Sequence, residues 1–134
     1  MERLRNKQEK FIKSLAALDR SIQVSLRENL QKDIKQSLIA SNIKHFEMCY
    51  ESVWKFLQLY LEQKYKQQLN SPKKIFRECF ALGILDSKIT EELLNISEAR
   101  NATVHDYDEE TAQETCKRIN DYYLTLKVLE KLSL

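Results

Sequence analysis

The stretch IASNIKHFEMCYESVWKFLQLYL, residues 39–61, decides the fold because it is apolar over a broad face of one helix. Its apolar residues recur at alternating spacings of four and three, which is the period of an α-helix. Additional apolar side chains widen the arc, as expected for a helix that contacts several neighbours. The sequence therefore predicts a central helix from about Asp33 to Tyr65. The repeating positions are Ile39, Ile43, Phe46, Tyr50, Val53, Leu57 and Tyr60, and the widening positions are Cys49, Trp54, Phe56 and Leu61.

A first helix is predicted before the central one, from about Arg3 to Arg27. A polar stretch, Glu28 to Lys32, follows it and is expected to contain the turn, although it holds no strong helix breaker. The apolar residues of this first helix again recur at helical spacing, so one side of it should face the core. They are Leu4, Phe11, Leu15, Leu18 and Ile22.

Three more helices follow the central one, and punctuation residues mark their ends. A helix favours Ser or Asp just before its first turn, Pro at its first position and Gly just past its end. The third helix is short, and the fifth begins after an interruption at residues 106–108. The expected caps and ends are Ser71, Pro72 and Gly83 for the short helix, Asp86 or Ser87 for the fourth helix, and Asp108 for the fifth.

Composition supports an all-α fold, since the 134 residues include one glycine, one proline and no strand pattern. We expect a single domain, residues 1–134, folded as an antiparallel up-and-down four-helix bundle with one additional short helix. The net charge of +2 is small, so any nucleic-acid footprint must be local. The three cysteines, Cys49, Cys79 and Cys116, are odd in number and widely spaced, which favours reduced packing thiols over a metal site. Without a signal-peptide core or a long apolar run, the protein is expected to be cytoplasmic, with no membrane contact.

The candidate functional residue is Arg100, because it occupies an inward position of the fourth helix. That helix buries Ile89, Leu93 and Ile96, and at about 100° per residue position 100 lies about 20° from the direction of Ile89. A guanidinium facing inward needs an anion or several acceptors. His105 follows five positions later, about 140° away on an unbroken helix, so the two converge only if the helix ends near Thr103. Such a pair suits metal-free phosphodiester chemistry.

The alternative interpretation of these residues is structural. Arg100 then pairs with Glu98, Asp106 or a carboxylate of another helix, and Glu47 is one such partner near the apolar arc. His105 is then a satisfied residue near a helix end.

Three segments of the chain resemble the nucleotidyltransferase substrate-binding branch of the HEPN superfamily. The most specific element is an R-x4-H-x-Y motif, matched by Arg100, His105 and Tyr107, and the resemblance extends from about Ile39 to the last residue. The three segments are IKHFE (43–47) with VWK (53–55), SPKKIFRECF (71–80), and RN (100–101) with HDYDEETA (105–112).

This resemblance implies a homodimer in which two copies of the motif meet at a shared cleft. Relatives with the motif are metal-independent endoribonucleases, commonly toxins paired with a minimal nucleotidyltransferase antitoxin that attaches AMP to the motif tyrosine. Here His105 would be the general base, Arg100 the stabiliser of phosphorane charge, Asn101 a positioning group and Tyr107 the modified residue. RNA is the expected substrate, and neither a cofactor nor a metal is implied.

Two functions therefore remain open. The first is the ribonuclease toxin, and the second is a non-catalytic subunit that holds a nucleotide for the nucleotidyltransferase. A purely structural dimer would leave the inward arginine unexplained. Basic residues around the second turn are also candidate RNA phosphate contacts, although a solvated, charged helix end is the more usual explanation. The contacts named for this role are Lys73, Lys74 and Arg77.

Overall fold

The computed structural model describes the backbone of residues 2–27, 30–105 and 109–132, and the side chains of these residues except 102–105 and 109–116. Within these ranges the chain is helical, with no strand, so the predicted all-α class is confirmed. The helices are α1 (Glu2–Ser25), α2 (Lys32–Tyr65), α3 (Pro72–Ala81), α4 (Ser87–His105) and α5 (Glu109–Leu129).

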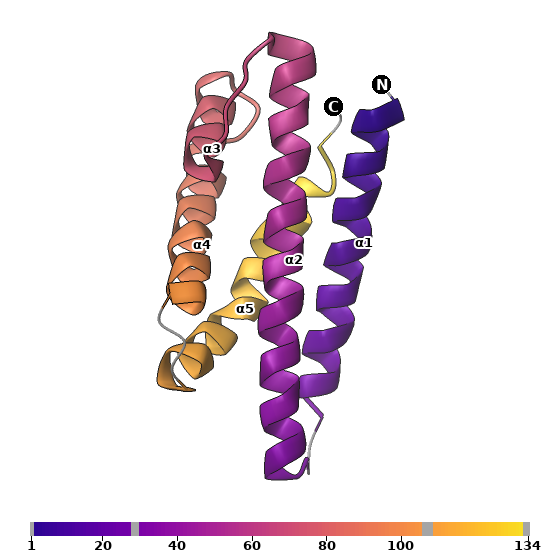
Figure 1. The fold of residues 1–134 in the computed structure, drawn as a ribbon, viewed down its shortest axis with the longest axis vertical. Coiled ribbons are helices and arrows are strands. Elements are labelled where there is room, and N and C mark those ends of the chain that lie inside the picture. Colours follow the sequence, from indigo (N-terminus) through magenta and orange to yellow (C-terminus); the bar gives the residue numbers. More distant parts are fainter. Residues whose placement is uncertain (1, 28–29, 106–108, 133–134) are drawn as a thin grey trace.

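Helix α2 is the longest helix and lies at the centre of the molecule (Figure 1). Helix α1 runs antiparallel along one side of it, α3 and α4 lie on the other side, and α5 crosses behind it. The four long helices alternate in direction, which is the up-and-down order predicted for the bundle. One side of α2, facing the viewer in Figure 1, is left uncovered between α1 and α4.

The core consists of the apolar stripes that helical periodicity predicts. Helix α1 and helix α2 interlock through stacked rings of Phe11 and Phe56, with centroids 6.5 Å apart. Phe46 of α2 stacks on Tyr122 of α5, with ring centroids 5.6 Å apart, and this contact holds α5 against α2. Three predicted positions of α2 are only partly buried: Ile39, Trp54 and Tyr60. The fully enclosed predicted residues include Phe11, Leu15, Leu18, Phe46, Val53, Phe56, Leu57, Leu61, Leu93 and Ile96.

A polar cluster joins the far end of α1 to the beginning of α2. The hydroxyl of Ser21 donates to Oδ1 of Asn42 at 2.5 Å, and Nδ2 of Asn42 donates to Oγ of Ser25 at 3.0 Å. Both Ser21 and Asn42 are buried, so these bonds replace the water that folding removes. The cluster fixes the pairing of α1 with α2 along their length.

The boundaries of α1 and α2 agree with the predicted ones to within two residues. Helix α1 ends at Ser25 rather than Arg27, and α2 begins at Lys32 rather than Asp33. Ser71 occupies the N-cap position of α3 and Pro72 its first position, as predicted. The Ser71 side chain makes no capping hydrogen bond, so the capping interaction predicted for it is wrong. Gly83 has a left-handed φ of 77° just past α3, a conformation that glycine adopts without strain.

Asp86 caps α4, because its Oδ1 accepts a hydrogen bond from the backbone N–H of Ile89 at 2.8 Å. The cap predicted for α5, Asp108, lies outside the described residues.

The cysteines that the structure describes are packing residues, as predicted. Cys49 and Cys79 are buried and free, and burial raises the pKa of each thiol to about 12. A thiol protonated throughout the neutral range is a poor nucleophile and a poor metal ligand. The Cys116 side chain lies outside the described residues. In the described ranges, no helix combines the length and the apolar character needed to cross a bilayer.

Candidate functional site

Arg100 lies on the last turns of α4, beyond the buried residues Leu93 and Ile96, and is half-buried as its helical position predicts. One turn earlier, the hydroxyl of Tyr50 donates to Oγ of Ser97 at 2.9 Å, and Ser97 in turn donates to the carbonyl of Leu93 at 3.0 Å. Burial raises the pKa of Tyr50, and the Ser97 bond opposes that shift only in part. The phenol therefore stays protonated. Its hydrogen bond to Ser97 helps to fix the position of α4 along the axis of α2, and Arg100 thereby lies beside α2.

The Arg100 guanidinium is only partly satisfied by the protein. Its Nη2 lies 3.4 Å from Oε1 of Glu51 on α2, a long contact, and the other oxygen of Glu51 lies 3.7 Å from Nζ of Lys55. The Nε of Arg100 is buried and has no hydrogen-bond partner among the described residues. A buried donor without a partner costs about 1–3 kcal/mol. A phosphate oxygen entering beside Arg100 would remove that cost and gain a charge-assisted bond.

The alternative prediction, that a carboxylate of another helix pairs with Arg100, is therefore confirmed in part. The partner is Glu51 and not Glu47, which lies one turn earlier on α2. Of the other proposed partners, Glu98 pairs with Lys73 of α3 instead, and Asp106 lies outside the described residues.

Arg100 opens into a cleft of about 340 Å³ between α1, α2 and α4. Most of its lining residues belong to α2, two belong to α1 and one to α4. Five cationic side chains and two carboxylates line it, a formal charge of +3, compared with +2 for the whole chain. This cationic cleft is lined by Lys7, Lys10, Lys44, Glu47, Met48, Glu51, Ser52, Lys55 and Arg100. Such a concentration of positive charge attracts anions.

Sequence analysis missed the four lysines of the cationic cleft. On α2 they were detectable, because Lys44, Glu51 and Lys55 recur at spacings of seven and four on one helical face. The α1 lysines Lys7 and Lys10 could not be predicted from the sequence, because their position beside the cleft depends on how α1 is rotated about its axis relative to α2. That rotation follows from core contacts between helices.

The basic residues predicted around the second turn lie elsewhere. Lys73 pairs with Glu98, Lys74 is exposed on α3, and Arg77 lines a separate hollow with Phe80 and residues of α4. None of the three lines the cationic cleft. Their role as phosphate contacts stays a prediction.

The rest of the predicted motif is only partly described. Asn101 is half-buried next to Arg100. The side chain of His105 and the whole of Tyr107 lie outside the described residues. Helix α4 continues to His105, so the predicted helix end near Thr103 is wrong. Residues 97–105 contain neither glycine nor proline, which explains why the helix does not stop there. Arg100 and His105 are thus separated by about 140° around one helix.

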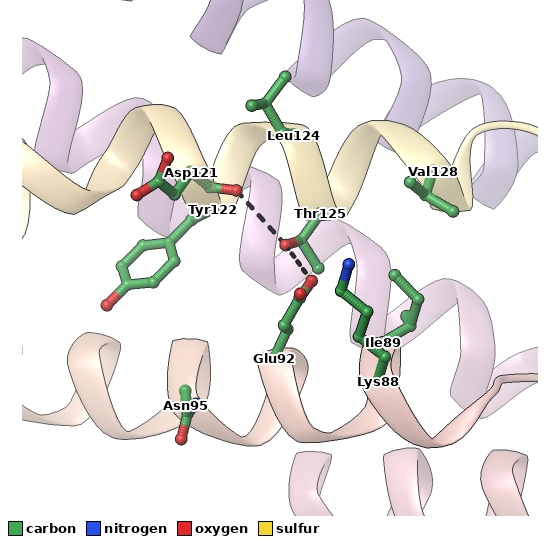
Figure 2. A pocket seen from close by; sticks show the side chains of 9 residues that line it. All are labelled: Lys88, Ile89, Glu92, Asn95, Asp121, Tyr122, Leu124, Thr125 and Val128. Atoms are coloured by element: carbon green, nitrogen blue, oxygen red, sulfur yellow. Dashed lines mark hydrogen bonds between the residues drawn. The ribbon is translucent and has the colours of Figure 1, made fainter.

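A second hollow, of about 510 Å³, lies between α4 and α5 and is larger than the cationic cleft (Figure 2). The Thr125 hydroxyl of α5 donates a hydrogen bond to Oε2 of Glu92 on α4, at 2.6 Å, and this bond links the two helices (Figure 2). One lysine, Lys88, and two carboxylates, Glu92 and Asp121, are its charged residues, so this α4/α5 groove does not favour anions. Its remaining lining residues are Ile89, Asn95, Tyr122, Leu124, Thr125 and Val128. Among the residues described, no group of His, Cys, Asp and Glu side chains could hold a metal ion.

Comparisons with known proteins agree with this architecture. The family model described as nucleotidyltransferase substrate binding protein like matches residues 6–133. No curated protein matches the chain. A crystal structure of a Thermus thermophilus protein is similar, with a TM-score of 0.76 and 29% identity over 92% of this chain and 99% of that one.

Two toxin–antitoxin structures share the fold at lower identity. One is a tri-AMPylated Shewanella oneidensis HEPN toxin in complex with its MNT antitoxin, with a TM-score of 0.73 and 18% identity over 91% of this chain and 94% of that one. The other is a toxin–antitoxin with AMP-PNP, with a TM-score of 0.74 and 17% identity over 91% and 95%. The fold is thus HEPN-like, and the family model covers nearly all of the sequence. The chain belongs to the nucleotidyltransferase substrate binding protein-like family.

Proposed function

We propose that this protein is a metal-independent endoribonuclease, the toxin of a HEPN/minimal nucleotidyltransferase toxin–antitoxin pair. The observation that carries the proposal is the Arg100 guanidinium, half-buried in a cationic cleft with an Nε donor that no described residue satisfies. Arginine presents a planar fork of donors that matches phosphate oxygens. The cleft therefore suits a phosphodiester, and the motif resemblance adds an acid–base residue five positions later.

In the proposed reaction the ribose 2′-hydroxyl attacks the adjacent phosphorus. His105 accepts the 2′-hydroxyl proton, Arg100 stabilises the charge of the phosphorane, and Asn101 helps to position the phosphate. The 2′-oxygen–phosphorus bond forms while the bond to the 5′-oxygen breaks. The 5′-oxygen takes a proton from water and leaves as a hydroxyl, a 2′,3′-cyclic phosphate remains, and His105 releases its proton to solvent. DNA lacks the nucleophile and should not be cut.

We propose further that the active unit is a homodimer. Because α4 continues to His105, the helix positions of Arg100 and His105 in one copy lie about 140° apart. A shared cleft between two copies would allow Arg100 of one to meet His105 of the other. Sedimentation equilibrium should give twice the chain mass of 15.9 kDa. A monomer that cleaves RNA at full rate would contradict this arrangement.

The proposed partner is a minimal nucleotidyltransferase, as in the toxin–antitoxin complexes that share the fold. Tyr107 is the proposed acceptor of AMP, and its position two residues after His105 would place the adduct beside the reacting phosphate. Mass spectrometry after incubation with the partner and ATP should locate AMP on the peptide that contains Tyr107. AMP found only on other residues would contradict this assignment.

The ribonuclease proposal is tested with purified protein and RNA in EDTA. Cleavage should persist without metal, and Arg100→Ala and His105→Ala should each lower it by about 100-fold or more. Lys88→Ala is the matched control, because it removes one cation from the α4/α5 groove. Circular dichroism checks that all variants fold. If both motif variants cut RNA at the wild-type rate, the ribonuclease assignment is wrong.

A second function, a non-catalytic subunit that holds a nucleotide for the nucleotidyltransferase, is favoured by one contact. Glu51 already neutralises part of the Arg100 charge, as expected for a binding group more than for a phosphorane stabiliser. This function predicts that nucleotide binding depends on Arg100 but not on His105, and that RNA is never cleaved. Isothermal titration with ATP and the RNA assay therefore separate the two.

A further inference from the structure

We propose that the cationic cleft binds several consecutive phosphates of single-stranded RNA, with the α1 lysines Lys7 and Lys10 as the main backbone contacts away from Arg100. The inference rests on the proposed function, because it extends the Arg100 site to the rest of the substrate. Neither lysine belongs to the R-x4-H-x-Y motif, although both lie within residues 6–133, which the family model matches.

The cleft is longer than one phosphate requires. Its α2 side runs from Lys44 to Lys55, eleven residues or about 16 Å along a helix axis. Glu51, which meets Arg100, lies between these two lysines. A single phosphate would occupy only the part of this length next to Arg100. Cations on both sides of it are suited to a linear polyanion.

The cations of the cleft are unevenly distributed about Arg100. Phe11 of α1 stacks on Phe56 of α2, and the two helices are antiparallel, so Lys7 and Lys10 lie level with the Lys55 end of the α2 side. Three lysines therefore lie to one side of Arg100, and Lys44 alone lies to the other. The bound strand should extend mainly from Arg100 toward α1.

The lysine charges of the cleft are available to a ligand. Among the described residues, Lys55 is the only one of the four lysines that contacts a carboxylate, namely Glu51, at 3.7 Å. In the described part of the chain Lys7, Lys10 and Lys44 have no ion-pair partner. Met48, with half of its side chain exposed, adds an apolar surface on the α2 side of the cleft against which a base can pack. Alternating phosphate and base contacts are typical of single-stranded nucleic-acid grooves.

The test measures binding of a fluorescent twelve-nucleotide RNA in the non-cleaving His105→Ala background. For single strands, each lost phosphate contact lowers the salt slope of log K by about 0.7. Lys7→Ala/Lys10→Ala should therefore lower the slope by about 1.4 and weaken binding by about 25-fold in 0.1 M salt. Lys88→Ala/Lys117→Ala removes the same charge from α4 and α5 and should change affinity by less than two-fold.

A second readout compares the twelve-nucleotide RNA with a dinucleoside monophosphate, which has a single phosphate. In an otherwise wild-type protein, Lys7→Ala/Lys10→Ala should slow cleavage of the twelve-nucleotide RNA at low substrate concentration by a larger factor than cleavage of the dinucleotide. Equal slopes for the α1 variant and its control would overturn the inference, as would polyglutamate binding as tightly as RNA with the same lysine dependence.

The two proposals fail separately. If the wild-type protein cuts the dinucleotide, but loss of the α1 lysines changes neither the binding nor the cleavage of the twelve-nucleotide RNA, the inference is wrong and the ribonuclease proposal stands. If RNA binds with the predicted lysine dependence and no substrate is ever cut, the phosphate-binding cleft stands and the ribonuclease is wrong.

Discussion

The cationic cleft and the α4/α5 groove differ in a way that separates size from chemistry. The groove is the larger, about 510 Å³ against about 340 Å³, yet a hydrogen bond from Thr125 to Glu92 spans it and its charged residues sum to −1. The cleft is smaller and carries a formal charge of +3. It also holds a buried Arg100 donor that no described residue satisfies. Unsatisfied donors and concentrated charge mark a ligand site better than volume does.

The strongest test of this difference is Arg100→Lys. Lysine keeps the positive charge but loses the planar fork and the Nε donor, so RNA cleavage should fall on the order of 100-fold. The thermal midpoint should change little, because the Glu51 contact is long and partly exposed. Single-turnover cleavage at saturating RNA measures the effect. Asn95→Ala, which alters an exposed side chain of the α4/α5 groove, is the control and should leave cleavage unchanged.

A full-rate Arg100→Lys enzyme would show that only the charge of the cleft matters. The distinction between a phosphate-binding fork and a diffuse basic surface would then be lost, and the unsatisfied Nε would have no functional meaning.

The converse test addresses the α4/α5 groove with Thr125→Ala. Thr125 is buried, and its hydroxyl bonds to a carboxylate, so its removal should lower the free energy of unfolding by about 1–2 kcal/mol. Cleavage and RNA affinity should not change. Urea denaturation of Thr125→Ala, with Asn95→Ala as the control, measures the free energy of unfolding. The RNA assay measures cleavage and RNA affinity. A loss of cleavage without a loss of stability would move the functional site to the groove.

The same two regions show how far sequence reasoning reaches. Helical period places a residue on a face, so the burial of Phe11 and Leu57 and the inward position of Arg100 were predictable. The partner of Arg100 was not, because the choice between Glu47 and Glu51 depends on how far α4 slides along α2. That height follows from the Tyr50–Ser97 hydrogen bond, which joins residues 47 positions apart.

The cationic cleft as a whole was equally beyond the sequence. Lys7 and Lys10 belong to it because α1 is rotated to place Phe11 on Phe56, a contact between residues far apart in the chain. The end of α4 differs from its prediction for another reason. The polar segment at residues 106–108 predicts an early helix end, but no residue from 97 to 105 breaks the helix.

The smallest expected effect comes from Glu51→Gln, which removes the carboxylate beside Arg100 and nearly preserves its shape. The variant should bind the twelve-nucleotide RNA a few-fold more tightly, because a partly exposed ion pair is worth about 0.2–1 kcal/mol and no longer competes with phosphate. For the same reason the free energy of unfolding should change by less than about 1 kcal/mol. Fluorescence anisotropy at two salt concentrations measures the gain in affinity.

Glu47→Gln is the matched control for Glu51→Gln, since Glu47 lines the same cleft but does not pair with Arg100. Both variants raise the charge of the cleft by one, so a general electrostatic effect would increase RNA affinity equally in the two. A larger gain for Glu51→Gln isolates direct competition for the guanidinium. Equal gains would mean that Glu51 acts only through its charge, and weaker binding by Glu51→Gln would show that the carboxylate holds Arg100 in the orientation that receives phosphate.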